Sequence, residues 1–457
     1  MAPTPSKRPR AAARTLVLSG ARVVTLDPGR RVLDADVVVS DGRIAEIRPR
    51  PARGRRATTG GSALDCAGLI LLPGLVQAHV HLCQTLFRGL ADDLALEDWL
   101  ARRIWPFEAA HTPESVYWSA MLGSAELLLG GTTAILDMET VRHTHAAFQA
   151  LREIGLRATA GKCLMDAATN PPGLRESTDQ ALQEAMDLCA RWHGAEGGRL
   201  RYCFAPRFAP SCTGPLLRAV SDAAERAGAM IHTHAAETPV ELELVKRTTG
   251  RDEIAYLDSM GIAGPRAALA HCVWVDRDTV RELARAGTNV VHCPSSNLKL
   301  GSGVAPIPEM LAAGCRVALG ADGAPCNNRL DGFEEMRLAA LIQKPRLGPD
   351  ALPAAAALEL ATLGGARALG LEREIGSIEV GKRADLLALD LSGPHGQPAD
   401  AEIASRLVYA ARAADVRHVL VDGRVVVRSG RLLTADLSEI RDKANAAARR
   451  LVRTVAG

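Results

Sequence analysis

The sequence has 457 residues, of which 47% are hydrophobic and 23% are charged. These values are typical of a globular protein and exclude a disordered or fibrous chain. Basic residues number 55 against 52 acidic ones, and the excess lies in the first fourteen residues, without which the balance is 51 against 52. A near-neutral body gives no support for a nucleic-acid partner, and no segment approaches the ~18 apolar residues that a membrane span requires.

Residues 1–14 are rich in Pro and Ala and carry four basic residues and no acid. This leader lacks the apolar core of a secretory signal, so we expect a disordered tail on a cytoplasmic protein. The ten Cys residues include no Cys-x-x-Cys pair, and a chain of this length does not depend on disulfides. We therefore expect reduced thiols.

Short apolar runs separated by turn signals occupy both ends of the chain. Asp41-Gly42 is a strong hairpin signal within residues 15–72, and Asp422-Gly423 repeats it within residues 372–457. We predict one small β-sandwich domain that combines these two terminal segments. A polar helix is expected over residues 438–452.

The middle of the chain, residues 73–371, alternates apolar runs with helical patterns. Eight runs are candidate strands: 75–81, 132–138, 157–165, 199–206, 230–235, 267–273, 288–293 and 316–321. No Gly-x-Gly-x-x-Gly follows the first of them, which disfavours a doubly wound dinucleotide-binding sheet. The pattern predicts an α/β fold, a TIM-type (β/α)8 barrel, whose chemistry gathers at the C-terminal ends of the strands.

Polar residues close several of these candidate strands. The first ends in His79-Val80-His81, and the two imidazoles lie on one face because side chains alternate along a strand. Later strands end in further polar residues: His234 with Glu237 three residues on, His271, His292 and Asp322. A single buried His is more often structural than functional, but several polar residues on the same rim of the barrel favour a functional site.

Three imidazoles and a carboxylate are a ligand set for one divalent ion, either Zn²⁺ or Fe²⁺, with room for a water. The proposed ligands are His79, His81, His234 and Asp322. His232 is a rival ligand, but it lies deeper in its strand, so we favour His234. A metal-bound water has a pKa of ~7, so a hydroxide nucleophile exists at neutral pH. Glu237 is then placed to move a proton, and His271 to hydrogen-bond the hydroxide or the oxyanion.

Several longer motifs resemble one known family. They are HVH after PGLV, HTHAAE, ALAHCVW, HCPSSNLKLGSG and ADGAPCNN with EMRLAALIQK. In these the chain resembles the amidohydrolase superfamily, in the branch of the S-adenosylhomocysteine, 5′-deoxyadenosine and guanine deaminases and the s-triazine hydrolases. The resemblance implies the same four ligands, Glu237 and His271 as the catalytic pair, and Asp322 as a further base. It also implies hydrolytic deamination with a single metal, and a homo-oligomer.

The residues that select the substrate are less clearly marked. Gln84 offers both a donor and an acceptor to a heterocycle edge. By resemblance, Arg207 matches guanine deaminases and Glu108 matches a ribose contact of S-adenosylhomocysteine deaminases. Lys162 either forms a salt bridge or contacts the substrate, and His292 is expected to line the pocket.

We therefore predict a metal-dependent deaminase of an amino-substituted purine or nucleoside-like N-heterocycle. The favoured substrates are 5′-deoxyadenosine and S-adenosylhomocysteine. Guanine or 8-oxoguanine deamination and s-triazine dechlorination remain alternatives of the same class. A non-catalytic barrel scaffold is the alternative from another class.

Overall fold

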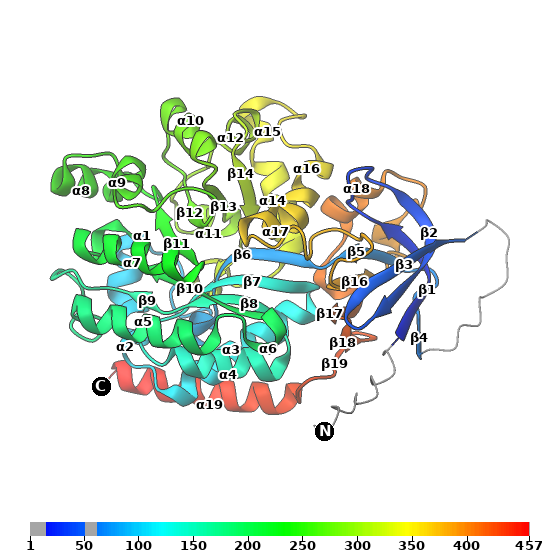
Figure 1. Ribbon diagram of the computed structural model, residues 1–457, viewed down its shortest axis with the longest axis horizontal. Helices are drawn as coiled ribbons and strands as arrows, with labels where there is room; N and C mark the ends of the chain where they lie inside the picture. The colour runs from blue at the N-terminus through cyan, green and yellow to red at the C-terminus, as the bar shows by residue number, and fades with distance from the viewer. Residues whose placement is uncertain (1–14, 51–61, 457) are drawn as a thin grey trace, which may run out of the picture.

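The computed structural model describes residues 15–50 and 62–456, so the leader predicted over residues 1–14 lies outside it. A barrel with its surrounding helices forms the larger part, and a sheet built from both ends of the chain lies beside it (Figure 1). All ten Cys residues are free and buried. Within the described ranges no helix is long and apolar enough to cross a membrane.

The barrel is a curled, parallel sheet that follows the chain in order. Its strands are β6 (Leu75–His81), β7 (Thr132–Met138), β8 (Arg157–Gly161), β9 (Cys163–Leu164), β10 (Leu200–Pro206), β11 (Met230–Ala235), β12 (Ala267–His271), β13 (Asn289–His292), β14 (Arg316–Leu319) and β15 (Asp322–Gly323). The two-residue strand β15 pairs with β6, which closes the barrel. The predicted (β/α)8 architecture is confirmed, with the predicted third strand divided into β8 and β9.

Helices follow the strands and cover the outside of the barrel. The principal ones are α3 (Pro113–Leu129), α4 (Thr144–Ile154), α5 (Thr178–Trp192), α7 (Gly214–Ala227), α8 (Pro239–Thr249), α9 (Glu253–Ser259), α10 (Arg277–Ala286), α11 (Pro294–Lys299), α12 (Ile307–Ala312), α14 (Gly332–Ile342) and α16 (Ala354–Glu359). Thr112 and Ser177 cap α3 and α5, each accepting a hydrogen bond from a backbone amide of the first turn. These two caps therefore determine where α3 and α5 begin.

The second sheet joins strands from both ends of the chain. It contains β1 (Thr15–Val24), β2 (Val32–Ser40), β3 (Arg43–Pro49), β4 (Ser62–Asp65), β5 (Ile70–Pro73), β16 (Leu386–Leu389), β17 (Val416–Val421), β18 (Arg424–Arg428) and β19 (Arg431–Leu432). Both Asp-Gly turns are hairpins in which the two residues have positive φ, 49° and 81° at Asp41-Gly42. Within residues 376–390, only residues 386–389 form a strand. The C-terminal helix, α19 (Leu437–Ala456), packs against α3.

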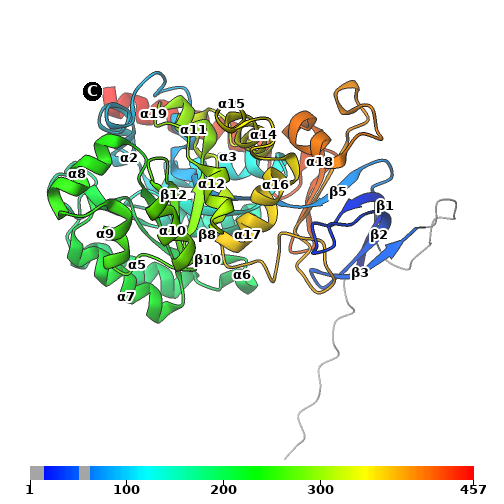
Figure 2. The same cartoon turned by 90° about the horizontal axis from the view of Figure 1, so that it is seen from above.

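A buried ion-pair network joins the two parts. The Arg157 guanidinium at the start of β8 contacts both carboxylate oxygens of Asp385 (2.6 and 3.0 Å) and one of Asp422 (2.9 Å). The sheet therefore meets the barrel at the N-terminal ends of the barrel strands. Seen from above, α8 and α9 lie at the end of the barrel away from this sheet (Figure 2).

Candidate metal centre

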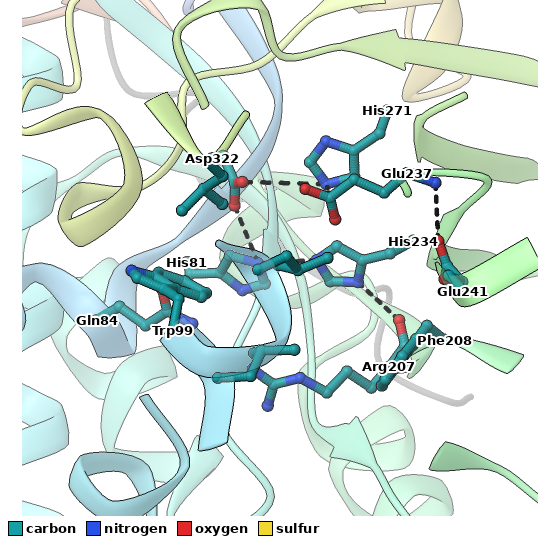
Figure 3. A pocket seen from close by; sticks show the side chains of 13 residues that line it. His81, Gln84, Trp99, Arg207, Phe208, His234, Glu237, Glu241, His271 and Asp322 are labelled. Carbon is teal, nitrogen blue, oxygen red and sulfur yellow. Dashed lines mark hydrogen bonds and ion pairs between the residues drawn. The ribbon is translucent and has the colours of Figure 1, made fainter. Parts of the chain in front are cut away.

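Four side chains converge at the C-terminal end of the barrel. Their ligand atoms all lie within 4.8 Å of one another: His79, His81, His234 and Asp322. The Nε2 atoms of His79 and His81 lie 3.1 and 3.2 Å from Asp322 Oδ1, and the Nε2 atoms of His81 and His234 are 3.1 Å apart. Figure 3 shows three of these residues lining one pocket.

Backbone carbonyls determine the tautomers of two of these imidazoles. His81 Nδ1 lies 2.7 Å from the carbonyl oxygen of Met138, and His234 Nδ1 lies 2.6 Å from that of Arg207. Because a carbonyl oxygen only accepts, each Nδ1 must carry the proton. Each Nε2 therefore directs a lone pair toward the centre of the cluster.

His79 is oriented by His232, the rival ligand. His232 Nδ1 donates to the Ala268 carbonyl (3.0 Å), so its Nε2 is an acceptor and receives a hydrogen bond from His79 Nδ1 (2.7 Å). His79 Nε2 is then left with a lone pair and has no hydrogen-bond partner among the described residues. His232 thus lies behind His79 and outside the four-residue group.

This donor set fits a divalent cation. Three imidazole lone pairs and a carboxylate face one another within a buried space, and only a positive charge makes that arrangement favourable. Burial lowers the pKa of His79 to about 4 and that of His234 well below its usual value, so both imidazoles stay neutral, as metal ligation requires. Nitrogen and carboxylate donors suit zinc and iron.

The backbone at Asp322 is strained. This residue has φ of 64°, a left-handed conformation unfavourable for a residue with a side chain. Its Oδ1 accepts from the Gly323 amide and its Oδ2 from the Ser296 hydroxyl, both at 2.7 Å. These bonds hold the carboxylate toward the imidazoles.

Glu237, on the turn after β11, and His271, at the end of β12, face the same pocket. His271 Nε2 lies 3.5 Å from Glu237 Oε2 and 4.0 Å from Asp322 Oδ2, distances that leave each side chain free to bond another group. Burial raises the pKa of Glu237 to about 7. Burial lowers the pKa of His271, but the Glu237 and Asp322 carboxylates outweigh it, and the net shift is upward.

One segment after β13 supplies a partner to each of these three side chains. Ser296 Oγ donates to Asp322 Oδ2 (2.7 Å), Asn297 Oδ1 accepts from His271 Nδ1 (2.8 Å), and Ser302 Oγ donates to Glu237 Oε1 (3.0 Å). All three partners are buried. These three partners were not among the residues predicted from the sequence. The signal that could have identified them is the run of polar residues in SSNLKLGS.

Two further carboxylates hold the turn that carries Glu237. The Glu237 amide donates to Glu241 Oε2 (2.7 Å), and the Ala236 amide donates to Glu253 Oε2 (2.8 Å). Ala236 has φ of 52°, so this turn is strained as well. Glu241 also lines the pocket.

The expected substrate-selecting residues fall into two groups, and the first is a network at the pocket wall. Arg207 contacts both oxygens of Glu108 (2.7 and 3.2 Å), and Gln84 Nε2 donates to the same carboxylate (2.8 Å). Gln84 and Arg207 line the pocket, whereas the fully engaged Glu108 lies behind them. The carboxylate therefore fixes the two groups that the pocket presents.

Lys162 and His292 form the second group and do not line this pocket. Lys162 Nζ is fully buried between Glu176 (2.7 Å) and Glu184 (3.0 Å), and it also donates to the Val141 carbonyl. The sequence left two roles open for Lys162, a salt bridge or a substrate contact, and the structure contains the salt bridge. Both ring nitrogens of His292 are buried without a partner among the described residues, and burial lowers its pKa to about 3.

The chain belongs to the amidohydrolase family, whose profile matches residues 70–426. It is 42% identical to a 5-methylthioadenosine/S-adenosylhomocysteine deaminase of Desulforudis audaxviator over 92% of this chain and 95% of the relative. It is 37% identical to a 5′-deoxyadenosine deaminase of Methanosarcina mazei, over 96% and 99%. A zinc-bound adenosine deaminase from Xanthomonas campestris superposes with a TM-score of 0.89 at 34% identity, over 96% and 98% of the two chains.

Proposed function

We propose that this protein is a metal-dependent hydrolytic deaminase of adenosine derivatives modified at the 5′ position. The convergence of four metal-binding side chains with Glu237 and His271 on one pocket carries this proposal. The names of the relatives, which are methylthioadenosine, S-adenosylhomocysteine and 5′-deoxyadenosine deaminases, support the substrate class. The filled ligand set argues against a non-catalytic scaffold.

His79, His81, His234 and Asp322 would hold a divalent ion, zinc by preference, and such an ion would supply hydroxide at neutral pH by lowering the pKa of water to ~7. The protein's own groups manage the protons and the charge. Glu237, with a pKa of about 7, can take up and release a proton near neutral pH and pass it to the ring nitrogen beside the reacting carbon. His271 Nε2 donates a hydrogen bond to the attacking oxygen, on which negative charge develops during the reaction. The oxygen of the water bonds to the amino-bearing ring carbon, and the proton that remains on this oxygen passes by way of Asp322 to the amino group. The carbon–nitrogen bond then breaks, ammonia leaves, and the oxygen remains on the ring as a carbonyl.

The pocket wall supports recognition of a planar heterocycle. Trp99 and Phe208 contribute aromatic surface to the pocket, and Gln84 and Arg207 contribute hydrogen-bonding groups. Glu108 holds Gln84 and Arg207 on the side of the pocket away from Glu237 and His271. A ring whose amino-bearing carbon faces Glu237 and His271 would then present its other edge to Gln84 and Arg207.

Guanine or 8-oxoguanine is a second candidate substrate, favoured by one specific observation. Both oxygens of Glu108 are already engaged by Arg207 and Gln84. Because Glu108 lies behind these two side chains and does not line the pocket, a ribose contact at Glu108 would require part of this network to open. A small base without ribose needs no such change.

A substrate panel tests the proposal directly. Metal-loaded protein is offered 5′-deoxyadenosine, 5′-methylthioadenosine, S-adenosylhomocysteine, guanine, 8-oxoguanine and a chlorotriazine, while released ammonia and chloride are measured. We expect ammonia from the adenosine derivatives and no chloride. Ammonia from guanine or 8-oxoguanine alone, or chloride alone, would overturn the assignment.

A further inference from the structure

Two carboxyl groups that the proposed reaction does not use lie against the turn that carries Glu237. Glu253, the first residue of α9, is fully buried, and Glu241, in the first turn of α8, is 5% exposed. Glu253 Oε2 accepts from the Ala236 amide (2.8 Å), and Glu241 Oε2 accepts from the Glu237 amide (2.7 Å). Figure 3 shows the Glu237 amide directed at Glu241. We call Glu241 and Glu253 the acid pair.

The turn held by the acid pair is strained, so its shape depends on its partners. Ala236 has φ of 52° and His271, at the end of the next strand, has φ of 73°. The Ala236 carbonyl oxygen accepts from the amides of Val273 and Trp274, at 2.9 and 3.0 Å. The peptide group between Ala236 and Glu237 is therefore bonded to the acid pair on one side and to the segment after His271 on the other. Its orientation sets the positions of the two catalytic side chains relative to each other.

The acid pair needs a proton. The carboxyl groups of Glu241 and Glu253 hydrogen-bond each other, and because a carboxylate only accepts, one of them must carry a hydrogen. Among the residues that the structure describes, neither forms an ion pair with Lys or Arg. Two ionised carboxylates side by side in a buried space would repel each other. Burial and the neighbouring Glu241 raise the pKa of Glu253 well above its usual value, so the proton lies on Glu253.

We propose that Glu241 and Glu253 are positioning residues for Glu237, and that they hold its turn through one proton shared between their carboxyl groups. This inference rests on the proposed function, in which Glu237 transfers protons, and adds two residues that act through it. With the proton in place, the acid pair accepts two backbone amides and is joined by an internal hydrogen bond. Without it, the carboxylates would separate and the amides of Ala236 and Glu237 would move with them.

Glutamine substitutions distinguish a shared proton from two independent acceptors. Glu253→Gln keeps an oxygen for the Ala236 amide and offers Glu241 an N–H in place of the proton. Glu241→Gln keeps an oxygen for the Glu237 amide and offers an N–H to Glu253, which then gives up its proton. The double variant turns two NH₂ groups toward each other with no acceptor between them. Each single variant is therefore compatible with the turn, and the double variant is not.

Steady-state kinetics of the metal-loaded protein measures this coupling, with an adenosine derivative that releases ammonia as the substrate. The loss of kcat in the double variant should exceed the product of the two single losses by about tenfold or more, with KM within about threefold and the metal content unchanged. Glu243→Gln, at an exposed position on α8, is the matched control and should behave as the natural chain. Single losses that simply multiply would contradict the shared proton. A change in KM alone would place Glu241 in substrate binding and overturn the positioning role.

Infrared spectroscopy tests the proton without requiring a reaction, and it decides the matter if the double variant does not fold. At neutral pH the natural chain should show a carbonyl stretch of protonated carboxyl groups that is weaker in Glu253→Gln and in Glu241→Gln but not in Glu243→Gln. A signal that stays unchanged in either acid-pair variant would overturn the inference. Absence of ammonia from every compound of the substrate panel, with the infrared change intact, would overturn only the proposed reaction.

Discussion

The ion pair between Arg207 and Glu108 provides a quantitative test of how the pocket wall is built. The two side chains are 5% and 1% exposed, and they are joined by contacts of 2.7 and 3.2 Å. Arg207→Met would leave the Glu108 carboxylate buried with only Gln84 as a partner. Glu108→Gln would leave the guanidinium buried without its counterion.

Removing one partner of a buried pair costs about 3–5 kcal/mol, because an uncompensated charge remains. Each single variant should therefore lower the free energy of unfolding by about that amount. The double variant leaves neither charge. Its loss of unfolding free energy should be smaller than the sum of the two single losses, and this difference should be about 2 kcal/mol or more.

Urea denaturation of the four proteins, followed by circular dichroism, measures this coupling. The same series also reports on function, since a folded double variant should have lost the pocket groups that Glu108 positions. Single variants that both stay within about 0.5 kcal/mol of the natural chain would refute the reasoning, as that is the range of ordinary surface substitutions.

Three further predictions follow from the site and its surroundings. Glu237→Gln should retain the metal and reduce ammonia release by about 10²–10⁴-fold, and near-normal turnover would show that the proton transfer is wrongly assigned. His232→Phe should weaken metal binding by about 10–100-fold in a chelator competition, because His79 loses the acceptor that sets its tautomer; unchanged affinity would contradict this role. Burial raises the pKa of Glu335 to about 8, so it holds its proton in the folded state and its contribution to stability should fall as the pH rises from about 4.5 through 8. Thermal unfolding from about pH 5 to 9 should show less of this loss for Glu335→Gln than for the control Glu334→Gln, and parallel curves would exclude the effect.

The barrel and its converging ligands could be predicted because both depend on local sequence patterns. A strand end is marked by the residues that form it, and in a barrel the strand ends meet on one rim. His79, His81, His234 and Asp322 therefore come together once eight strands are placed in order. The apolar runs of the C-terminal segment are a weaker guide, because within residues 376–390 only residues 386–389 pair with neighbouring strands.

The supporting groups could not be predicted in the same way. Glu108 and Arg207 are 99 residues apart, and their contact depends on how the chain between β6 and α3 folds over the barrel. Ser302 reaches Glu237 from a loop 65 residues further along the chain. Such contacts depend on loop geometry, for which side-chain periodicity carries no information.

Metal content measured together with turnover tests the central claim most directly. Protein stripped with a chelator is titrated with zinc, while bound metal and ammonia release from 5′-deoxyadenosine are followed in the same samples. The account predicts that activity rises with bound zinc and reaches its maximum at one ion per chain, and that His234→Ala shows neither binding nor activity. Full ammonia release by metal-free protein would contradict it.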